Sequence, residues 1–244
     1  MTWTPAILSH RGVRYLENHD EPRLAAPAHW GGKGEAAARA LLVAQFASTC
    51  SPVLFYNGQE VGERADGPGG YGGDNGRTSI FDYTTLPRLQ HWTNGGRYDG
   101  ALLTPQEASL RDFCTAFLPL MQHPALSKGG FYGLNWANSE TPDYGRAEGE
   151  RTSGHFLYAF LRHNRKARST VLAVCNFSTT TPFSTHIHIP EDACSWAGKK
   201  AEACTFRNLL EPSAPELHVT RAQLSSPGLP VTIPPGGALL LEWI

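Results

Sequence analysis

The stretch Val13-Arg14-Tyr15-Leu16-Glu17-Asn18-His19-Asp20-Glu21-Pro22-Arg23 decides how the chain is organised. Its first half is β-branched, aromatic and aliphatic, which is typical of a buried strand, and Pro22 cannot continue that strand as a central member of a sheet. Asn18, His19 and Asp20 therefore lie where a strand ends, which is where α/β folds carry their chemistry. An imidazole beside a carboxylate can bind polyhydroxy ligands or transfer protons. The alternative interpretation is that the three acidic residues of this stretch form a solvated turn.

A helix and a second strand follow this stretch. Alanine and leucine recur at helical spacing between Glu35 and Thr49, and Val53-Leu54-Phe55-Tyr56 is the continuous apolar run expected of a strand that is buried on both faces. Strand, helix and strand within so few residues form a βαβ unit, so we expect the two strands to be parallel. The second strand also ends in polar residues, Asn57-Gly58-Gln59-Glu60, and parallel pairing places both polar clusters on one rim.

The connection from Glu63 to about Leu103 is longer than ordinary loops, and it is too aromatic for disorder. We interpret it as an ordered loop beside a binding site; the alternative is a loop with a purely structural role. Thr104-Pro105-Gln106-Glu107 then predicts a helix start, because Thr104 can cap the residue 107 N–H and Glu107 can reach back to the cap. Pro119 should kink that helix or end it early.

After Gly129, the spacing of the apolar residues changes from that of helices to the alternation typical of strands. Short apolar runs separated by turn residues predict strands at residues 155–162, 170–177, 186–189, 231–233 and 238–243. Such spacing indicates an antiparallel β-sandwich. We therefore predict two domains, an α/β domain over residues 1–127 and a β-sandwich over residues 128–244, with the boundary near Ser127 to Gly130.

The composition narrows the classes of function. A formal net charge of -1 over 244 residues leaves no basic excess for nucleic acid or for an anionic membrane surface, so we expect neither partner. No apolar run approaches transmembrane length, and the first residues lack a basic start followed by an apolar core. The chain as given carries no export signal, and we expect a cytoplasmic protein.

Neither a metal nor a cofactor is predicted. His186 and His188 lie two apart on one strand face, but they lack a third ligand in a supporting pattern, and an exposed edge strand explains them better. The five cysteines form no C-x-x-C pair, and burial as free thiols explains Cys50, Cys114 and Cys175. Cys194 and Cys204 could bridge a hairpin in an oxidising compartment. The sequence contains no G-x-S-x-G nucleophile elbow and no nucleotide-binding glycine loop.

The segment Tyr15-Leu16-Glu17-Asn18-His19-Asp20 resembles the seventh-strand motif of the α-amylase family, glycoside hydrolase family 13. Pro52 to Gly62 is similar to that family's eighth barrel strand, and His123-Pro124-Ala125-Leu126 resembles the end of its eighth helix. The alternating region, with Val171 to Ser178 and Pro234-Pro235-Gly236, resembles its C-terminal β-domain. The resemblance covers nearly the whole chain. It implies the last two β/α units of a (β/α)8 TIM barrel followed by an antiparallel β-sandwich.

The resemblance also implies roles for particular residues. Asp20 would be the catalytic carboxylate that binds sugar hydroxyls and favours an oxocarbenium-like transition state, and His19 would hydrogen-bond the sugar in the same subsite. Asn18 and Arg23 are further candidates for substrate binding. The substrate expected from the family is an α-glucan or an oligosaccharide, cleaved or transferred with retention at an α-glucosidic linkage.

The chain departs from the family pattern in one important respect. A retaining glycosidase needs a carboxylate nucleophile and a second carboxyl group as acid/base, and the family takes both from the fourth and fifth barrel strands. Those strands would precede Val13, where only a short lead-in is present. A closed barrel takes about 250 residues, roughly twice what is available before the sandwich. We therefore expect a catalytically incomplete chain, silent on its own or completed by an upstream chain. The alternative is a non-catalytic carbohydrate-binding or assembly subunit.

Overall fold

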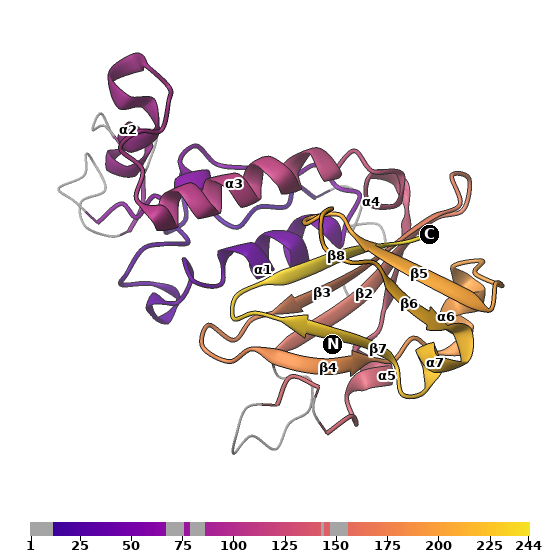
Figure 1. The fold of residues 1–244 in the computed structure, drawn as a ribbon. Coiled ribbons are helices and arrows are strands. Elements are labelled where there is room, and N and C mark those ends of the chain that lie inside the picture. Colours follow the sequence, from indigo (N-terminus) through magenta and orange to yellow (C-terminus); the bar gives the residue numbers. More distant parts are fainter. Residues whose placement is uncertain (1–11, 67–75, 79–85, 143, 147–155) are drawn as a thin grey trace.

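The computed structural model describes residues 12–66, 76–78, 86–142, 144–146 and 156–244. Its centre is a six-stranded antiparallel sheet in the order β1-β2-β3-β8-β5-β6, and a two-stranded antiparallel sheet, β4-β7, packs against one face of it (Figure 1). The strands are β1 (Gly130–Gly133), β2 (Leu157–Asn164), β3 (Ser169–Asn176), β4 (Phe183–Ile187), β5 (Ala203–Asn208), β6 (Leu217–Thr220), β7 (Leu229–Ile233) and β8 (Ala238–Trp243).

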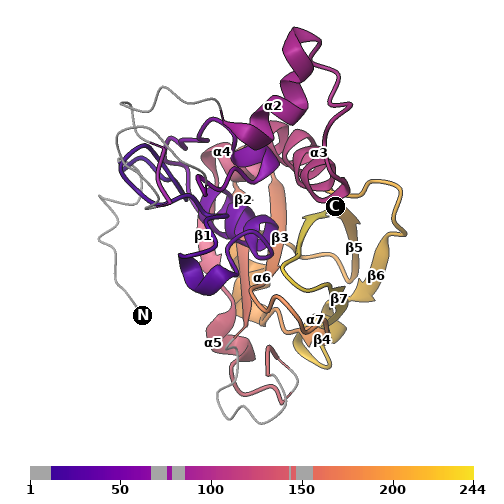
Figure 2. The ribbon, with the colours of Figure 1, turned by 90° about the vertical axis from the view of Figure 1, so that its left-hand side faces the viewer.

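Helices from the first half of the chain cover the other face of the six-stranded sheet (Figures 1 and 2). The α-helices are α1 (Ala38–Leu42), α2 (Pro87–Thr93), α3 (Pro105–Leu120), α4 (Pro124–Lys128), α5 (Asn135–Asn138), α6 (Glu191–Trp196) and α7 (Arg221–Ser225). A π-helical turn, η3 (Val43–Ala47), continues α1, and single 3-10 turns occur at η2 (Trp30–Gly32), η4 (Gln59–Val61) and η5 (Asn94–Gly96).

Strand β3 shows how the sequence pattern builds two cores. Seven of its eight positions are buried, and successive side chains point to opposite faces. Leu172 and Val174 face the two-stranded sheet, where they pack with Phe206 and Ile233. The intervening side chains face the helices. That helix-side core joins both halves of the chain, and its members include Leu42, Phe46, Phe117, Phe160, Val171, Ala173, Cys175 and Leu240.

Helix α3 begins where the sequence predicts. The Thr104 hydroxyl accepts the Glu107 N–H at 3.3 Å, and the Glu107 carboxylate accepts the Thr104 N–H at 2.8 Å, so both bonds of the capping box are present. Pro119 lies in the last turn, and the helix ends at Leu120. This confirms the prediction of an early end, since a proline ring there disturbs only the turn that precedes it.

The turn between β7 and β8 closes against the start of α1. The Ala40 N–H donates to the Gly236 carbonyl at 3.1 Å, and the Gly236 N–H donates to the Ser178 carbonyl at 2.7 Å. Gly236 has φ +62°, and a Cβ at this position would lie 1.9 Å from the Ala36 carbonyl oxygen. Only glycine fits both the conformation and the space, so the turn fastens the sheet to the helical layer.

The five predicted strands are present as β2, β3, β4, β7 and β8, and the predicted helix within residues 35–49 is present as α1 with η3. Strands β1, β5 and β6 are not predicted from the sequence. All five cysteines are free, so the Cys194–Cys204 bridge is not formed; Cys50 is partly exposed, whereas the prediction placed it among the buried thiols. No helix in the described part of the chain is long and apolar enough to cross a bilayer.

Candidate functional site

The segments around Arg14 and Val53 run side by side and in parallel, as predicted. The Arg14 N–H donates to the Pro52 carbonyl at 2.9 Å, and the Leu54 N–H donates to the Arg14 carbonyl at 2.8 Å. The pairing stops after this one bridge, so neither segment forms a regular strand. Of the two parallel strands predicted around Arg14 and Val53, the structure contains only this single β-bridge.

The side chains near this bridge are more exposed than the sequence pattern predicts. Val13 is 55% exposed, Tyr15 39% and Leu54 37%. The prediction that these positions are buried is wrong for this chain. Val53 and Phe55, which alternate with Leu54, pack against the helix-side core. One side of the paired segments is thus covered and the other faces outward.

Asn18 shapes the loop at the end of the first segment. Its side-chain oxygen accepts the N–H groups of Asp20 at 2.7 Å and of Glu21 at 3.0 Å, which is an Asx turn. The turn leaves the His19 side chain 44% exposed and the Asp20 side chain 78% exposed. His19 Nε2 lies 3.3 Å from Asp20 Oδ2. The structure therefore brings together an imidazole and a carboxylate on a surface loop.

Arg23 and Glu17 lie directly beneath the loop. Arg23 is 0% exposed and Glu17 1%, and Arg23 Nη1 is 2.9 Å from Glu17 Oε1. The second carboxylate oxygen accepts the Leu24 N–H at 2.5 Å. Burial raises the pKa of Glu17, and the Arg23 charge opposes that shift. The solvated-turn interpretation is wrong for Glu17, whose side chain anchors the loop from inside.

Arg23 also joins the loop to two later segments. Its Nε donates to the Thr78 hydroxyl at 2.7 Å, and its guanidinium carbon lies 4.3 Å from the centre of the Tyr56 ring. The Tyr56 hydroxyl donates to the Thr78 carbonyl at 2.8 Å. Fully buried and bonded to protein groups, Arg23 is placed to position the loop, and the predicted sugar contact by Arg23 stays a prediction. The sequence does not indicate that Glu17, Tyr56 and Thr78 support the Asn18–Asp20 loop through Arg23.

The long connection after Glu63 is described in part. Glu63 is 1% exposed and accepts the N–H groups of Arg88 at 3.0 Å and Leu89 at 3.3 Å, so it caps helix α2. The aromatic residues Tyr71, Phe81 and Tyr83, on which the interpretation of a binding-site loop depends, lie outside the described residues. That interpretation stays a prediction.

A network of ion pairs fixes α2 against α1 and α3. Glu35 accepts hydrogen bonds from Arg88 at 2.6 Å and from Arg64 at 2.8 Å, and Glu107 Oε2 lies 2.9 Å from His91 Nδ1. Burial alone would raise the pKa of Glu35, but the two arginines outweigh it and lower the pKa. Glu35, Arg64, Arg88 and Glu107 line a cleft of about 760 Å³. Because Arg64 and Arg88 are already paired with carboxylates and Arg39 donates to the Ser109 hydroxyl, we interpret the cleft as structural.

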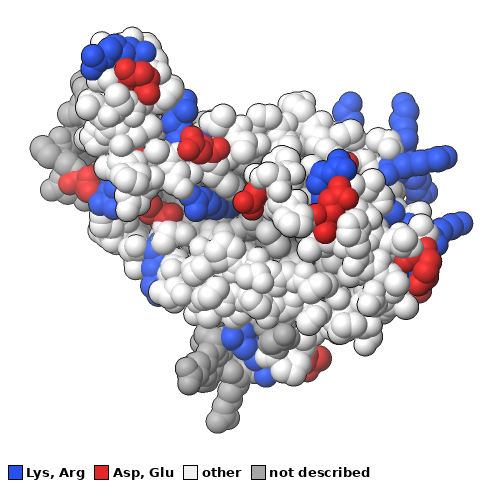
Figure 3. Space-filling view, viewed as in Figure 1, with Lys and Arg blue, Asp and Glu red and all other residues white. Residues whose placement is uncertain are grey.

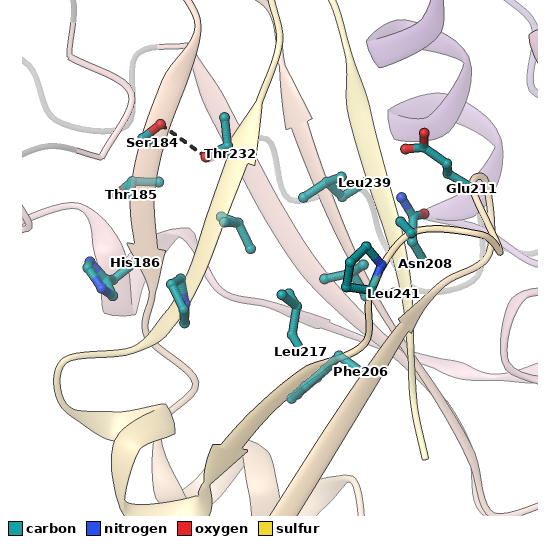
Figure 4. A pocket seen from close by; sticks show the side chains of 14 residues that line it. Ser184, Thr185, His186, Phe206, Asn208, Glu211, Leu217, Thr232, Leu239 and Leu241 are labelled. Carbon is teal, nitrogen blue, oxygen red and sulfur yellow. Dashed lines mark hydrogen bonds between the residues drawn. The ribbon is translucent and has the colours of Figure 1, made fainter.

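A second cleft opens between the two sheets. It has a volume of about 550 Å³, and Figure 4 shows Thr185 on β4 opposite Leu239 and Leu241 on β8, with Phe206 and Leu217 below. The lining is mostly apolar because β4 and β7 cover only part of the larger sheet. On the face drawn in Figure 3, this region carries few charged side chains, whereas acidic and basic side chains gather over the helices and at the right-hand edge.

The described residues contain no group of three or more His, Cys, Asp or Glu side chains that could hold a metal ion. The Asn18–Asp20 loop offers the chemistry of a carboxylate and an imidazole. A mostly exposed carboxylate accepts hydrogen bonds from hydroxyl groups, and an adjacent imidazole donates or accepts one. Such a pair suits a polyhydroxy ligand, but it supplies only one carboxylate at the site.

No protein-family model matches the sequence, and no curated protein matches it. Among solved structures, the γ-CGTase of alkalophilic Bacillus clarkii is similar in fold, with a TM-score of 0.51 and 14% identity over 94% of this chain and 26% of the other. AmyP in complex with maltotriose has a TM-score of 0.48 and 15% identity, over 93% of this chain and 40% of the other. Bacillus licheniformis trehalose-6-phosphate hydrolase has a TM-score of 0.48 and 13% identity, over 95% of this chain and 43% of the other. The chain spans about a quarter of the length of the γ-CGTase. At such low sequence identities, this similarity concerns the fold alone. Both the fold and the sequence motifs of the chain resemble part of an α-amylase-family enzyme.

Proposed function

We propose that this chain is a carbohydrate-active protein of the α-amylase family, and that the Asn18–Asp20 loop is its sugar-contacting site. The observation that carries the proposal is the exposed His19–Asp20 pair, held by the Asn18 turn and by the buried Glu17–Arg23 pair. A rigid acceptor beside an imidazole can bond neighbouring sugar hydroxyls, and in a complete site those bonds would strengthen as charge develops on the ring. The substrate class is an α-glucan or a maltooligosaccharide.

The same proposal predicts that the 244-residue chain does not hydrolyse its ligand. The family resemblance identifies Asp20 as one of three carboxylates, and no residue of this chain matches the motifs that carry the nucleophile and the acid/base. Purified chain incubated with maltooligosaccharide should release no reducing ends above the background. Hydrolysis that disappears in Asp20→Asn would show that the chain carries its own catalytic pair.

Binding can be measured by calorimetry with the same oligosaccharide. We expect Asp20→Asn and His19→Ala to weaken binding by about tenfold or more, the cost of one charge-assisted hydrogen bond. Glu21→Gln is the matched control, because Glu21 is an exposed acidic neighbour on the same turn. An equal loss of affinity in Glu21→Gln would mean that the net negative charge of the loop, and not the His19–Asp20 pair, determines binding.

The exposed side of the paired segments suggests what completes the site. Val13, Tyr15 and Leu54 form an uncovered apolar edge beside a single parallel bridge. Further parallel β/α units, supplied by an upstream chain, would bury these side chains and extend the two segments into strands. Without them, the purified chain should self-associate at high concentration, and Leu54→Lys should reduce that association. A monomeric, cooperatively melting chain at high concentration would contradict this part of the proposal.

An observation on the sheet domain favours a second candidate, a non-catalytic carbohydrate-binding subunit. Trp136 is 54% exposed, and the nearby Tyr132 ring packs on Trp196 with centroids 5.4 Å apart. The Tyr132 hydroxyl donates to the Asp192 carboxylate. An exposed ring beside a carboxylate offers an apolar face and a polar acceptor to one ligand. Binding lost in Trp136→Ala but retained in Asp20→Asn would favour this candidate over the loop.

A further inference from the structure

Arg162, on strand β2, is a buried guanidinium whose pairing is unusual. Its residue is 1% exposed, and no carboxylate in the described part of the chain forms an ion pair with it. Nη1 donates to the Ala47 carbonyl at 3.2 Å, and Nη2 donates to the carbonyls of Gly129 at 2.6 Å and Leu126 at 3.2 Å. Nε has no hydrogen-bond partner among the described groups.

Carbonyl dipoles alone are a poor substitute for a counter-ion. Arginine stays protonated in proteins, and a buried charge is costly unless it is paired with an opposite charge. Burial lowers the pKa of Arg162, and the neighbouring Cys50 opposes that shift. The surroundings of Arg162 therefore favour an anion next to it.

Cys50 is the titratable group in contact with this charge. Arg162 Nη2 lies 2.7 Å from Cys50 Sγ, within hydrogen-bond distance. The sulfur also lies 3.2 Å from the Gly129 carbonyl oxygen, to which the neutral thiol donates. Loss of that proton leaves a thiolate beside the guanidinium, and this converts an unpaired buried charge into an ion pair.

Cys50 borders a cleft that is open to solvent. Cys50 is partly exposed and lines a cleft of about 340 Å³ together with Ser51, Pro52 and Gln122. The other four cysteines are buried, and burial raises the pKa of Cys114 to about 12 and that of Cys194 to about 11. Burial likewise raises the pKa of Cys175 and of Cys204. A reactive thiol needs both access and a nearby positive charge, and Cys50 has both.

We propose that Cys50 is the reactive thiol of this chain, with Arg162 as the charge that stabilises its thiolate, and that small electrophiles entering the cleft modify it selectively. With iodoacetamide, the thiol proton passes to solvent, the sulfur forms a bond to the methylene carbon, and the carbon–iodine bond breaks to release iodide. The thioether product has no negative charge. Because Arg162 joins Ala47, Leu126 and Gly129, modification should also weaken the contact between the helical layer and the sheet.

The test is the rate of iodoacetamide labelling at neutral pH, followed for each cysteine by peptide mass spectrometry on the folded chain. Cys50 should react at least about tenfold faster than the other four, and Arg162→Gln should slow its labelling by about tenfold while Arg162→Lys retains part of the rate. Arg207→Gln is the matched control, because Arg207 is an arginine on the same sheet that pairs with Glu216 at the surface. A Cys50 rate in Arg162→Gln within about twofold of the unmodified sequence would overturn the proposal.

A second measurement needs no substitution and covers the case in which Arg162→Gln unfolds. The ratio of Cys50 labelling by anionic iodoacetate to labelling by neutral iodoacetamide should be about threefold higher in the folded chain than in urea, because the guanidinium attracts the anionic reagent only in the folded state. An equal or lower ratio in the folded chain would overturn the proposal. Neither measurement depends on sugar binding.

Discussion

Replacing Arg23 by methionine removes one half of a fully buried ion pair beneath the candidate site. Glu17 then keeps its Leu24 hydrogen bond but loses the guanidinium 2.9 Å away. Leaving a buried carboxylate without its partner costs about 3–5 kcal/mol, and loss of the contact with the Tyr56 ring adds about 0.5–2 kcal/mol. Methionine retains most of the apolar volume, so the cavity contribution is small. We expect a loss of about 5 kcal/mol, a large part of the stability of an ordinary domain.

The dependence on pH separates the charge from simple packing. Burial raises the pKa of Glu17 above its ordinary value of 4.5, so the folded chain holds this proton more tightly than the unfolded chain does. The group therefore contributes stability below 4.5 that is lost as the pH rises through its folded pKa. Removing Arg23 removes the charge that opposes the shift. The penalty of Arg23→Met should therefore be larger at about pH 7.5 than at about pH 5.

Urea unfolding followed by far-ultraviolet circular dichroism measures this penalty at both pH values. The double variant Glu17→Gln with Arg23→Met has no unpaired charge, and its loss should be smaller than that of Arg23→Met alone, at about 1–2 kcal/mol. A loss below about 1 kcal/mol for Arg23→Met, or one that is independent of pH, would refute the claim that this pair anchors the loop.

Three further predictions concern the framework. Phe117→Ala should cost about 3–5 kcal/mol in urea unfolding, because the ring is 0% exposed and stacks on Phe46 and Phe113; a cost below about 1 kcal/mol would show that the helix-side core is not well packed. Gly236→Ala should lower the melting temperature by more than Gly198→Ala, a glycine of similar φ with open space around it; equal effects would contradict the close contact with Ala36. Pairing with arginines lowers the pKa of Glu35 despite its burial, so its contribution to stability is present above pH 4.5 and is lost as the pH falls through the folded pKa. Glu35→Gln should make the free energy of unfolding fall less steeply as the pH drops below 4.5, and an unchanged pH dependence would contradict this role of Glu35.

Local signals in the sequence were sufficient for most of the fold. The capping residues Thr104 and Glu107 predicted the start of α3, and the continuous apolar run of β3 predicted a buried strand. Short segments carried weaker signals. β6 has four residues, half-buried at best, at the edge of the larger sheet, and its two apolar side chains are too few to predict a strand.

The candidate site was predictable only in its surface part. The motif pointed to His19 and Asp20, which depend on a local turn set by Asn18. It did not reveal that Glu17 and Arg23 turn inward, because Thr78 and Tyr56, the partners of Arg23, are far away in the sequence. The exposed Val13 and Leu54 were missed for a related reason, since an apolar run indicates what a segment can bury but not whether a neighbour is present to cover it.

The most direct test of the account is a nuclear magnetic resonance titration of the 244-residue chain with a maltooligosaccharide, observing the ring protons of His19. If the Asn18–Asp20 loop contacts sugar, these resonances should shift and saturate, and the shifts should disappear in Asp20→Asn but persist in Glu21→Gln. Saturable binding that leaves the His19 resonances unmoved, or shifts that survive in Asp20→Asn, would contradict the central claim that this loop is the sugar-binding site.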